Sequence, residues 1–126
     1  MTVEIARFTI PGEPKPKERP RVTVRRTYTP TSTKEYEAKV RAAWDAAPRP
    51  DMPECVRIDI FFLRSNRIRV DLDNLVKAVT DGLNKRAYAD DWQIHDLRAQ
   101  KFYTTKERAR TEVVVYAIDG DREERF

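Results

Sequence analysis

The sequence contains few of the residues from which several common kinds of site are built. Of its 126 residues, one is cysteine and one is histidine. An intrachain disulfide is therefore impossible, and zinc sites built from cysteines or from two histidines are excluded. A Ser-His-Asp triad or a Cys-His pair would have to use His95. Any metal ion in this chain must be bound mainly by oxygen atoms.

Long apolar runs are also absent. No stretch approaches the roughly 18 consecutive apolar residues that a membrane helix needs. The first ten residues, MTVEIARFTI, have neither the basic start nor the cleavable apolar stretch of a signal peptide. We therefore expect a protein without membrane contact, in the reducing cytoplasm. A chain of 126 residues suits one compact domain, 1–126, and is too short for two.

Charge, in contrast, is abundant and unevenly placed. Lysine and arginine number 25 against 21 acidic residues, which gives a net charge of +4. The proline-rich segment 11–30, which we call the basic arm, has six basic residues and two acidic ones, so it alone is +4. Its basic residues are Lys15, Lys17, Arg19, Arg21, Arg25 and Arg26. Such a segment is typical of contacts with a nucleic-acid backbone, and a solvated loop is the alternative.

Hydrophobic periodicity predicts the elements on either side of this arm. Alternation favours strands at 3–10, 56–62, 92–103 and 111–118, and a helical period favours helices at 33–46 and 73–86. Ser32 and Glu35 fit a capping box before the first helix, and Asp73 lies at or near the N-cap of the second. The order β-α-β-α-β-β predicts an α+β domain with two helices packed on one face of a mixed sheet of about four strands. The polar tail, 119–126, is expected to be mobile.

Acidic residues gather where a basic loop leads into the second helix. Asp71 and Asp73, two residues apart in an extended entry, point the same way, and Lys77 follows one helical turn later. Asp90 and Asp91 precede the third strand, so three or four carboxylates could converge. Clustered carboxylates repel one another unless a cation is present, and oxygen ligands favour Mg²⁺ or Mn²⁺. Such a centre suits phosphodiester hydrolysis.

The same acids have a purely structural interpretation. Asp73 can cap a helix, Lys77 can form a salt bridge with a residue four positions away, and Asp81 can lie on a solvated face. Asp90 and Asp91 can form a turn. Three arginines directly before the acids favour the functional interpretation, because with the basic arm they surround an anionic centre by phosphate-binding groups. These are Arg64, Arg67 and Arg69.

Two segments together resemble a known signature. The run DLDNLVK at 71–77, followed by DDWQI at 90–94, is similar to the signature of the RusA-type Holliday junction resolvases, small endonucleases common in phages and prophages. The similarity is closest over 70–101. Segments at 10–12, 19–21, 28–30 and 34–36 also resemble the N-terminal half of phage-type members. Most of the chain is therefore covered.

The resemblance implies a homodimeric, Mg²⁺-dependent enzyme of DNA recombination and repair that binds four-way junctions and makes paired nicks. Asp71, Asp73 and Asp91 match the metal-binding acids of the family, and Lys77 matches its catalytic lysine. Asp90 matches the acid adjacent to the last of these. An exposed apolar face of the sheet is a reasonable surface for the dimer contact.

We therefore expect a structure-selective endodeoxyribonuclease that resolves Holliday junctions. Its DNA contacts would come from the six basic residues of the arm and the three arginines before the acids. Tyr28 and Trp92 are candidates for stacking on unpaired bases. Two alternatives stay open: a non-catalytic DNA- or RNA-binding module, and a metal nuclease that acts on flaps or single strands.

Overall fold

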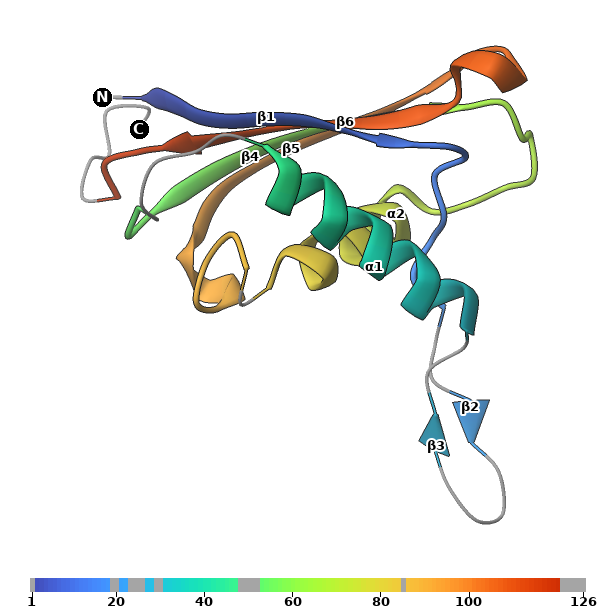
Figure 1. Ribbon diagram of the computed structural model, residues 1–126, viewed down its shortest axis with the longest axis horizontal. Helices are drawn as coiled ribbons and strands as arrows, with labels where there is room; N and C mark the ends of the chain where they lie inside the picture. Colours follow the sequence, from blue (N-terminus) through green and yellow to red (C-terminus); the bar gives the residue numbers. More distant parts are fainter. Residues whose placement is uncertain are drawn as a thin grey trace.

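The computed structural model describes residues 2–18, 21–22, 27–28, 31–47, 53–84 and 86–120. It is an α+β domain in which two helices lie on one face of a four-stranded mixed sheet (Figure 1). The strands are β1 (Val3–Pro11), β4 (Val56–Arg64), β5 (Ile94–Tyr103) and β6 (Arg110–Ala117), in the sheet order β1-β6-β4-β5. β4 and β5 pair in parallel, whereas β6 pairs antiparallel with β1 and with β4. The predicted fold class and element order are confirmed.

The basic arm contains a small separate ribbon. β2 (Arg21–Val22) and β3 (Thr27–Tyr28) pair antiparallel and lie away from the main sheet, beyond the start of the first helix (Figure 1). The DNA contacts expected of Arg19, Arg25 and Arg26 lie outside the described residues, as does the predicted mobile tail from residue 121 onward.

The first helix, α1 (Thr31–Ala46), packs on the sheet through the stripe that its sequence predicts. Tyr36, Val40 and Trp44 are all buried, and the Trp44 ring meets Phe8 of β1 edge-on at 5.8 Å between centroids. Burial raises the pKa of Tyr36 to about 12, although its hydroxyl lies 2.7 Å from the Thr111 hydroxyl. Ser32 lies inside the helix, so its predicted role as the cap is wrong.

The second helix, α2 (Leu72–Leu83), begins and ends earlier than expected. Its N-cap is Asp71, and its C-cap is Asn84, whose amide donates to the Thr80 carbonyl. A Cβ atom placed on Gly82 would come within 2.8 Å of the Val40 Cβ, so glycine permits α1 and α2 to pack closely. Among the described residues no helix is long and apolar enough to span a membrane.

The face of the sheet away from the helices is only partly the apolar surface that we expected, because Phe61 and the exposed Phe102 share it with paired charges. Arg57 and Asp59 form an ion pair there at 2.7 Å, and the Arg57 guanidinium also lies 4.6 Å from the centre of the Tyr116 ring. Asp96 and Arg98 pair on the neighbouring strand. Because strand residues alternate between faces, apolar side chains such as Ile58 and Ile60 point to the helices and leave these charges outside.

Candidate active site and nucleic-acid interface

The first two acids of the predicted site lie at the start of α2. Asp71 has extended backbone angles, and its carbonyl accepts from the amides of Asn74 and Leu75. The Asp71 side chain makes no capping hydrogen bond, and Asp73 lies within the first turn instead of at the N-cap. Both residues are exposed. Their carboxylates therefore stand in solvent at the positive end of the helix dipole, where they can meet a ligand.

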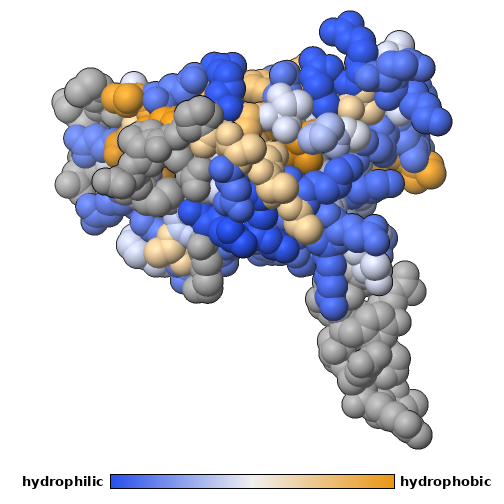
Figure 2. Space-filling view, in the orientation of Figure 1, coloured by the Kyte–Doolittle hydropathy of each residue, from blue (hydrophilic) through white to orange (hydrophobic). Residues whose placement is uncertain are grey.

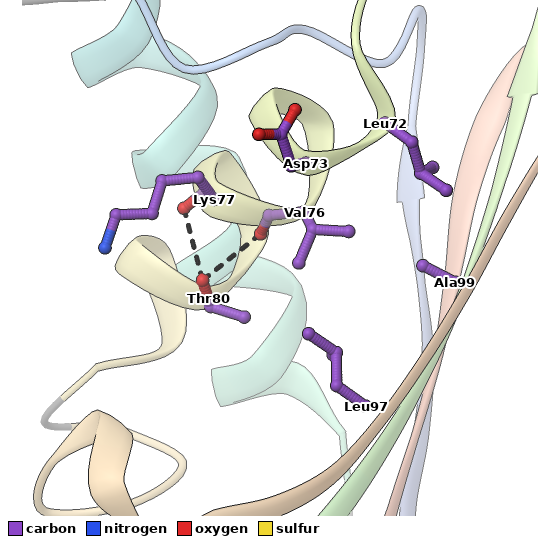
Figure 3. Close-up of a pocket in the computed structure, with 7 residues that line it drawn as sticks. All are labelled: Leu72, Asp73, Val76, Lys77, Thr80, Leu97 and Ala99. Atoms are coloured by element: carbon purple, nitrogen blue, oxygen red, sulfur yellow. Dashed lines mark hydrogen bonds between the residues drawn. The ribbon is translucent and has the colours of Figure 1, made fainter.

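Lys77 follows on the exposed side of α2 but is paired away from Asp73. Its ammonium lies 3.0 Å from a carboxylate oxygen of Asp81. Figure 3 shows the ends of the Asp73 and Lys77 side chains pointing in different directions. The salt bridge expected of Lys77 therefore forms with Asp81, four residues later, and not with Asp73, four residues earlier. Lys77 keeps 55% of its side-chain surface exposed, so the pair leaves it accessible to a polyanion.

The basic arm is fastened to this helix through Lys17. The Lys17 ammonium pairs with Glu37 of α1 at 2.8 Å and with Asp81 of α2 at 3.2 Å, and its backbone amide donates to the Asn74 carbonyl. Burial disfavours the charged ammonium, but the hydrogen bonds and charges of the two carboxylates outweigh it, and the pKa of Lys17 is raised. Lys17 therefore tethers the arm to both helices, and its predicted DNA contact stays a prediction. Lys15 is exposed.

The second pair of acids belongs to a short 3-10 helix, η1 (Asp91–Gln93), directly before β5. Asp90 caps it by accepting from the Asp91 amide at 2.7 Å, and the Gln93 side chain accepts from the Asp90 amide in return. The Gln93 amide group also donates to the Glu54 carbonyl. Asp90 thus caps η1, and Gln93 is a structural residue that joins two loops.

Asp91 faces a later turn of α2 than the other acids. Its Oδ1 is buried without a hydrogen-bond partner in the described part of the chain. The Tyr88 hydroxyl donates to the Thr80 carbonyl, and burial together with the nearby charges of Asp91 and Asp81 raises the pKa of Tyr88. Asp91 therefore lies beside the Thr80 turn of α2. Thr80 is seven residues beyond Asp73, which is about 10 Å along a helix.

This separation decides how well the acids fit a metal ion. Carboxylate oxygens are suitable ligands for Mg²⁺, and the unpaired Oδ1 of Asp91 is an atom that a cation would satisfy. Across the described ranges, however, no three His, Cys, Asp or Glu side chains are grouped closely enough to hold a metal ion. The predicted convergence of three or four carboxylates is therefore not found within the described part of a single chain.

A groove between α2 and β5 passes the candidate residues. It has a volume of about 640 Å³, and Asp73 and Lys77 line it together with mainly apolar side chains (Figure 3). Those are Leu72, Val76, Leu97 and Ala99, with Thr80. The Thr80 hydroxyl donates to the carbonyls of Val76 and Lys77 within the helix. The wall is therefore apolar between the two charged side chains.

The loop 65–70, between β4 and α2, is held in place by polar contacts. The Glu13 carboxylate accepts from the amides of Ser65 and Asn66. Burial opposes ionisation of Glu13, but these backbone hydrogen bonds prevail and lower its pKa. Arg64 is 4% exposed and donates to the Ile68 carbonyl, so the predicted DNA contact of Arg64 is wrong. Arg64 lies on the same side of β4 as the buried Ile60 and Phe62, so its side chain points toward the helices.

Two of the arginines do remain on the surface of this loop. Arg67 and Arg69 are exposed, and the Arg67 guanidinium lies 4.2 Å from the centre of the Tyr103 ring at the end of β5. Lys101, also on β5, donates to the Val70 carbonyl at 2.7 Å. Tyr103 and Lys101 escaped the sequence analysis, although strand alternation places both on one side of β5. The face of the molecule drawn in Figure 2 is mainly hydrophilic, and its hydrophobic patches are smaller than the hydrophilic area around them.

A small α+β domain with exposed carboxylates at a helix start, a nearby lysine and a basic surface loop has the features of a DNA-cleaving enzyme. The family model described as "Endodeoxyribonuclease RusA" matches residues 11–116, and the chain belongs to this endodeoxyribonuclease family. The resemblance drawn from the two acidic segments is thereby confirmed.

A curated relative is similar over a shorter region. The chain is 44% identical over 50 residues to a protein of Bacillus subtilis (strain 168) described as "Uncharacterized protein YqaN". The aligned region is 40% of this chain and 34% of that protein, so the match spans about a third of the length of the relative.

Proposed function

We propose that this protein is a structure-selective endodeoxyribonuclease that cleaves four-way DNA junctions by hydrolysis of phosphodiester bonds. The observation that carries the proposal is the family match over 11–116, which includes both acidic segments and the basic arm. The proposal includes a homodimer that makes paired nicks, dependence on Mg²⁺ with Mn²⁺ as a substitute, and a role in DNA recombination and repair in the cytoplasm.

Within the chain, the exposed groups at the start of α2 are proposed to meet the DNA. Asp71 and Asp73 would act at the scissile phosphate, and Lys77 would stabilise negative charge that develops on it. The proposed metal ligands are Asp71, Asp73, Asp91 and Asp90. The described part of the chain does not bring three of these carboxylates together.

Two features of the geometry would also suit a DNA-binding module without catalytic activity. Asp90 caps η1, and the acids stand in two separate places, as they would in a non-catalytic DNA-binding module. Such a module would bind a junction equally well with and without its acids and would never nick it. Cleavage by the purified protein therefore separates the two functions, and competition by flap or single-stranded DNA separates junction cleavage from other nuclease activities.

Asparagine substitutions at the helix start test the proposed site. We expect Asp71→Asn and Asp73→Asn each to abolish junction cleavage and to keep junction binding. Each substitution removes the negative charge of one side chain and leaves its size and shape nearly unchanged. The matched control is Asp45→Asn, since Asp45 is an exposed acid of α1 whose ion pair with Arg86 lies outside the proposed site. Cleavage at the wild-type rate by both site variants would overturn the assignment.

A further inference from the structure

Tyr103 is a large aromatic residue that the folded chain leaves in solvent. It ends β5, and 57% of its surface is exposed. It is paired with Arg64 at the end of β4, and the amide of the next residue, Thr104, donates to the Arg64 carbonyl at 2.8 Å. Alternation places Tyr103 on the same side of the strand as Lys101 and Ala99, which is the side of α2. The ring is thus exposed but attached to a well-held strand end.

A guanidinium lies over this ring. The Cζ atom of Arg67 is 4.2 Å from the ring centroid, a distance typical of a cation–π contact. Arg67 belongs to the loop 65–70, which is fixed from both sides by Glu13 and by the hydrogen bond from Arg64 to the Ile68 carbonyl. The guanidinium covers one face of the ring, so a base that joins this pair stacks on the opposite face of Tyr103 or on the outer face of the guanidinium.

The pair lies beside the acidic end of the same loop. Lys101, two residues before Tyr103 on the same side of β5, donates to the carbonyl of Val70, the residue directly before Asp71. Side chains two residues apart on a strand are about 7 Å apart. The Tyr103 ring consequently stands next to the chain segment that carries the proposed acids, and the exposed Arg69 adds a second cation to this region.

We infer that Tyr103 and Arg67 form a stacking site for an unpaired nucleobase of the DNA substrate. An aromatic ring offers stacking to any base, and the arginines provide positive charge for the phosphates on either side. Bases at the crossover of a branched DNA can leave their stack at less cost than bases within a duplex. The inference rests on the proposed function, since it takes branched DNA as the ligand. Trp92, the earlier candidate, lies in η1 at the opposite end of β5.

The test is a comparison of protein and DNA changes in one binding experiment. Dissociation constants are measured without divalent cations for a four-way junction and for a series of junctions that each lack one base near the crossover. The proteins are the wild type, Tyr103→Leu, Tyr103→Phe and Phe102→Leu. Phe102 is the matched control, because it is the adjacent exposed aromatic and alternation turns it to the other side of the sheet.

We expect Tyr103→Leu to weaken binding of the intact junction by at least about fivefold, the lower range for loss of one stacked base. Tyr103→Phe and Phe102→Leu should bind as the wild type does. On one of the junctions that lack a base, the wild type and Tyr103→Leu should bind equally, because the stacking partner is gone.

Two results would overturn the inference. In the first, Tyr103→Leu binds every junction as tightly as the wild type does, and the wild type prefers junctions to duplex DNA. The proposed function would then stand without the stacking site. The other is a loss of affinity that is equal for all DNAs and accompanied by a change in oligomeric state by light scattering, which would make Tyr103 a contact between copies of the chain. A wild type without preference for junctions would instead refute the proposed function.

Discussion

Lys77 is the residue at which a structural and a catalytic role differ most clearly in their consequences. Its ion pair with Asp81 spans one turn on the surface of α2, and such exposed pairs contribute about 0.3–0.5 kcal/mol. A lysine that stabilises charge in the transition state affects the rate instead, where the loss of one such contact costs a hundredfold or more. The two roles are therefore separable by experiment.

We predict that Lys77→Met folds, binds junctions nearly normally and cleaves them at least about a hundredfold more slowly in single turnovers. Methionine keeps the length of the side chain and its helix propensity while it removes the charge. Lys77→Arg should restore only part of the rate, because a planar guanidinium does not replace a compact ammonium. A single-turnover rate close to that of the wild type in Lys77→Met would leave this lysine with its structural role alone.

Lys17 should instead affect stability. Its removal leaves Glu37 and Asp81 partly buried beside each other without their shared cation, so we predict that Lys17→Met lowers the free energy of unfolding by about 1–3 kcal/mol at pH 7. Urea unfolding measures this difference, and the exposed Lys15→Met is the control. A stability equal to that of the wild type would contradict the tether.

The pH dependence of this effect follows from the raised pKa of Lys17. The folded state holds the proton more tightly than the unfolded chain does. The stabilisation is therefore complete below the ordinary lysine value of 10.5 and is lost as the pH rises through the higher folded-state value. The wild type and Lys17→Met should accordingly become more similar in stability above that pH.

At the scale of elements, the position of α2 depends on its contact with α1. Gly82 has no side chain where the two helices meet, and a Cβ there would come within 2.9 Å of the Val40 Cγ1 as well as close to its Cβ. We predict that Gly82→Ala destabilises the fold by about 1–2 kcal/mol, because overpacking exceeds the gain in helix propensity of about 1 kcal/mol. Chemical denaturation measures the change, and a Gly82→Ala protein as stable as the wild type would show that the helices can separate freely.

Local pattern predicted these elements well because burial and periodicity coincide along them. The stripe of Tyr36, Val40 and Trp44 is readable from spacing, and so is the alternation of β4. The N-cap of α2 is Asp71, two residues before the predicted Asp73, since both acids are acceptable near a helix start and only the tertiary structure selects between them.

The contacts that the sequence could not reveal join distant segments. Lys17 meets Glu37 and Asp81, and Glu13 meets the loop after β4, 52 residues later in the chain. Composition correctly identified a basic arm, but it cannot tell a lysine held by two acids from one free to bind phosphate. For the same reason the burial of Arg64 was missed.

At the scale of the whole molecule, two equivalent cuts in a four-way junction require two equivalent sites. A dimer with two-fold symmetry supplies them from one kind of chain. The open face of the sheet combines paired charges with the exposed Phe102, so a contact between subunits there would be only partly apolar. We predict a homodimer at working concentration, measured by light scattering with and without DNA. A monomer under both conditions would remove the basis for paired nicks.

Cleavage of a labelled four-way junction, with the nicks mapped in each strand, shows whether this protein is a junction nuclease. We predict two symmetric nicks near the crossover in the presence of Mg²⁺ or Mn²⁺, no cleavage in their absence, and no comparable cleavage of the linear duplex. An intact junction after incubation with either metal, although the protein binds it, would contradict the proposed nuclease activity and leave a DNA-binding module.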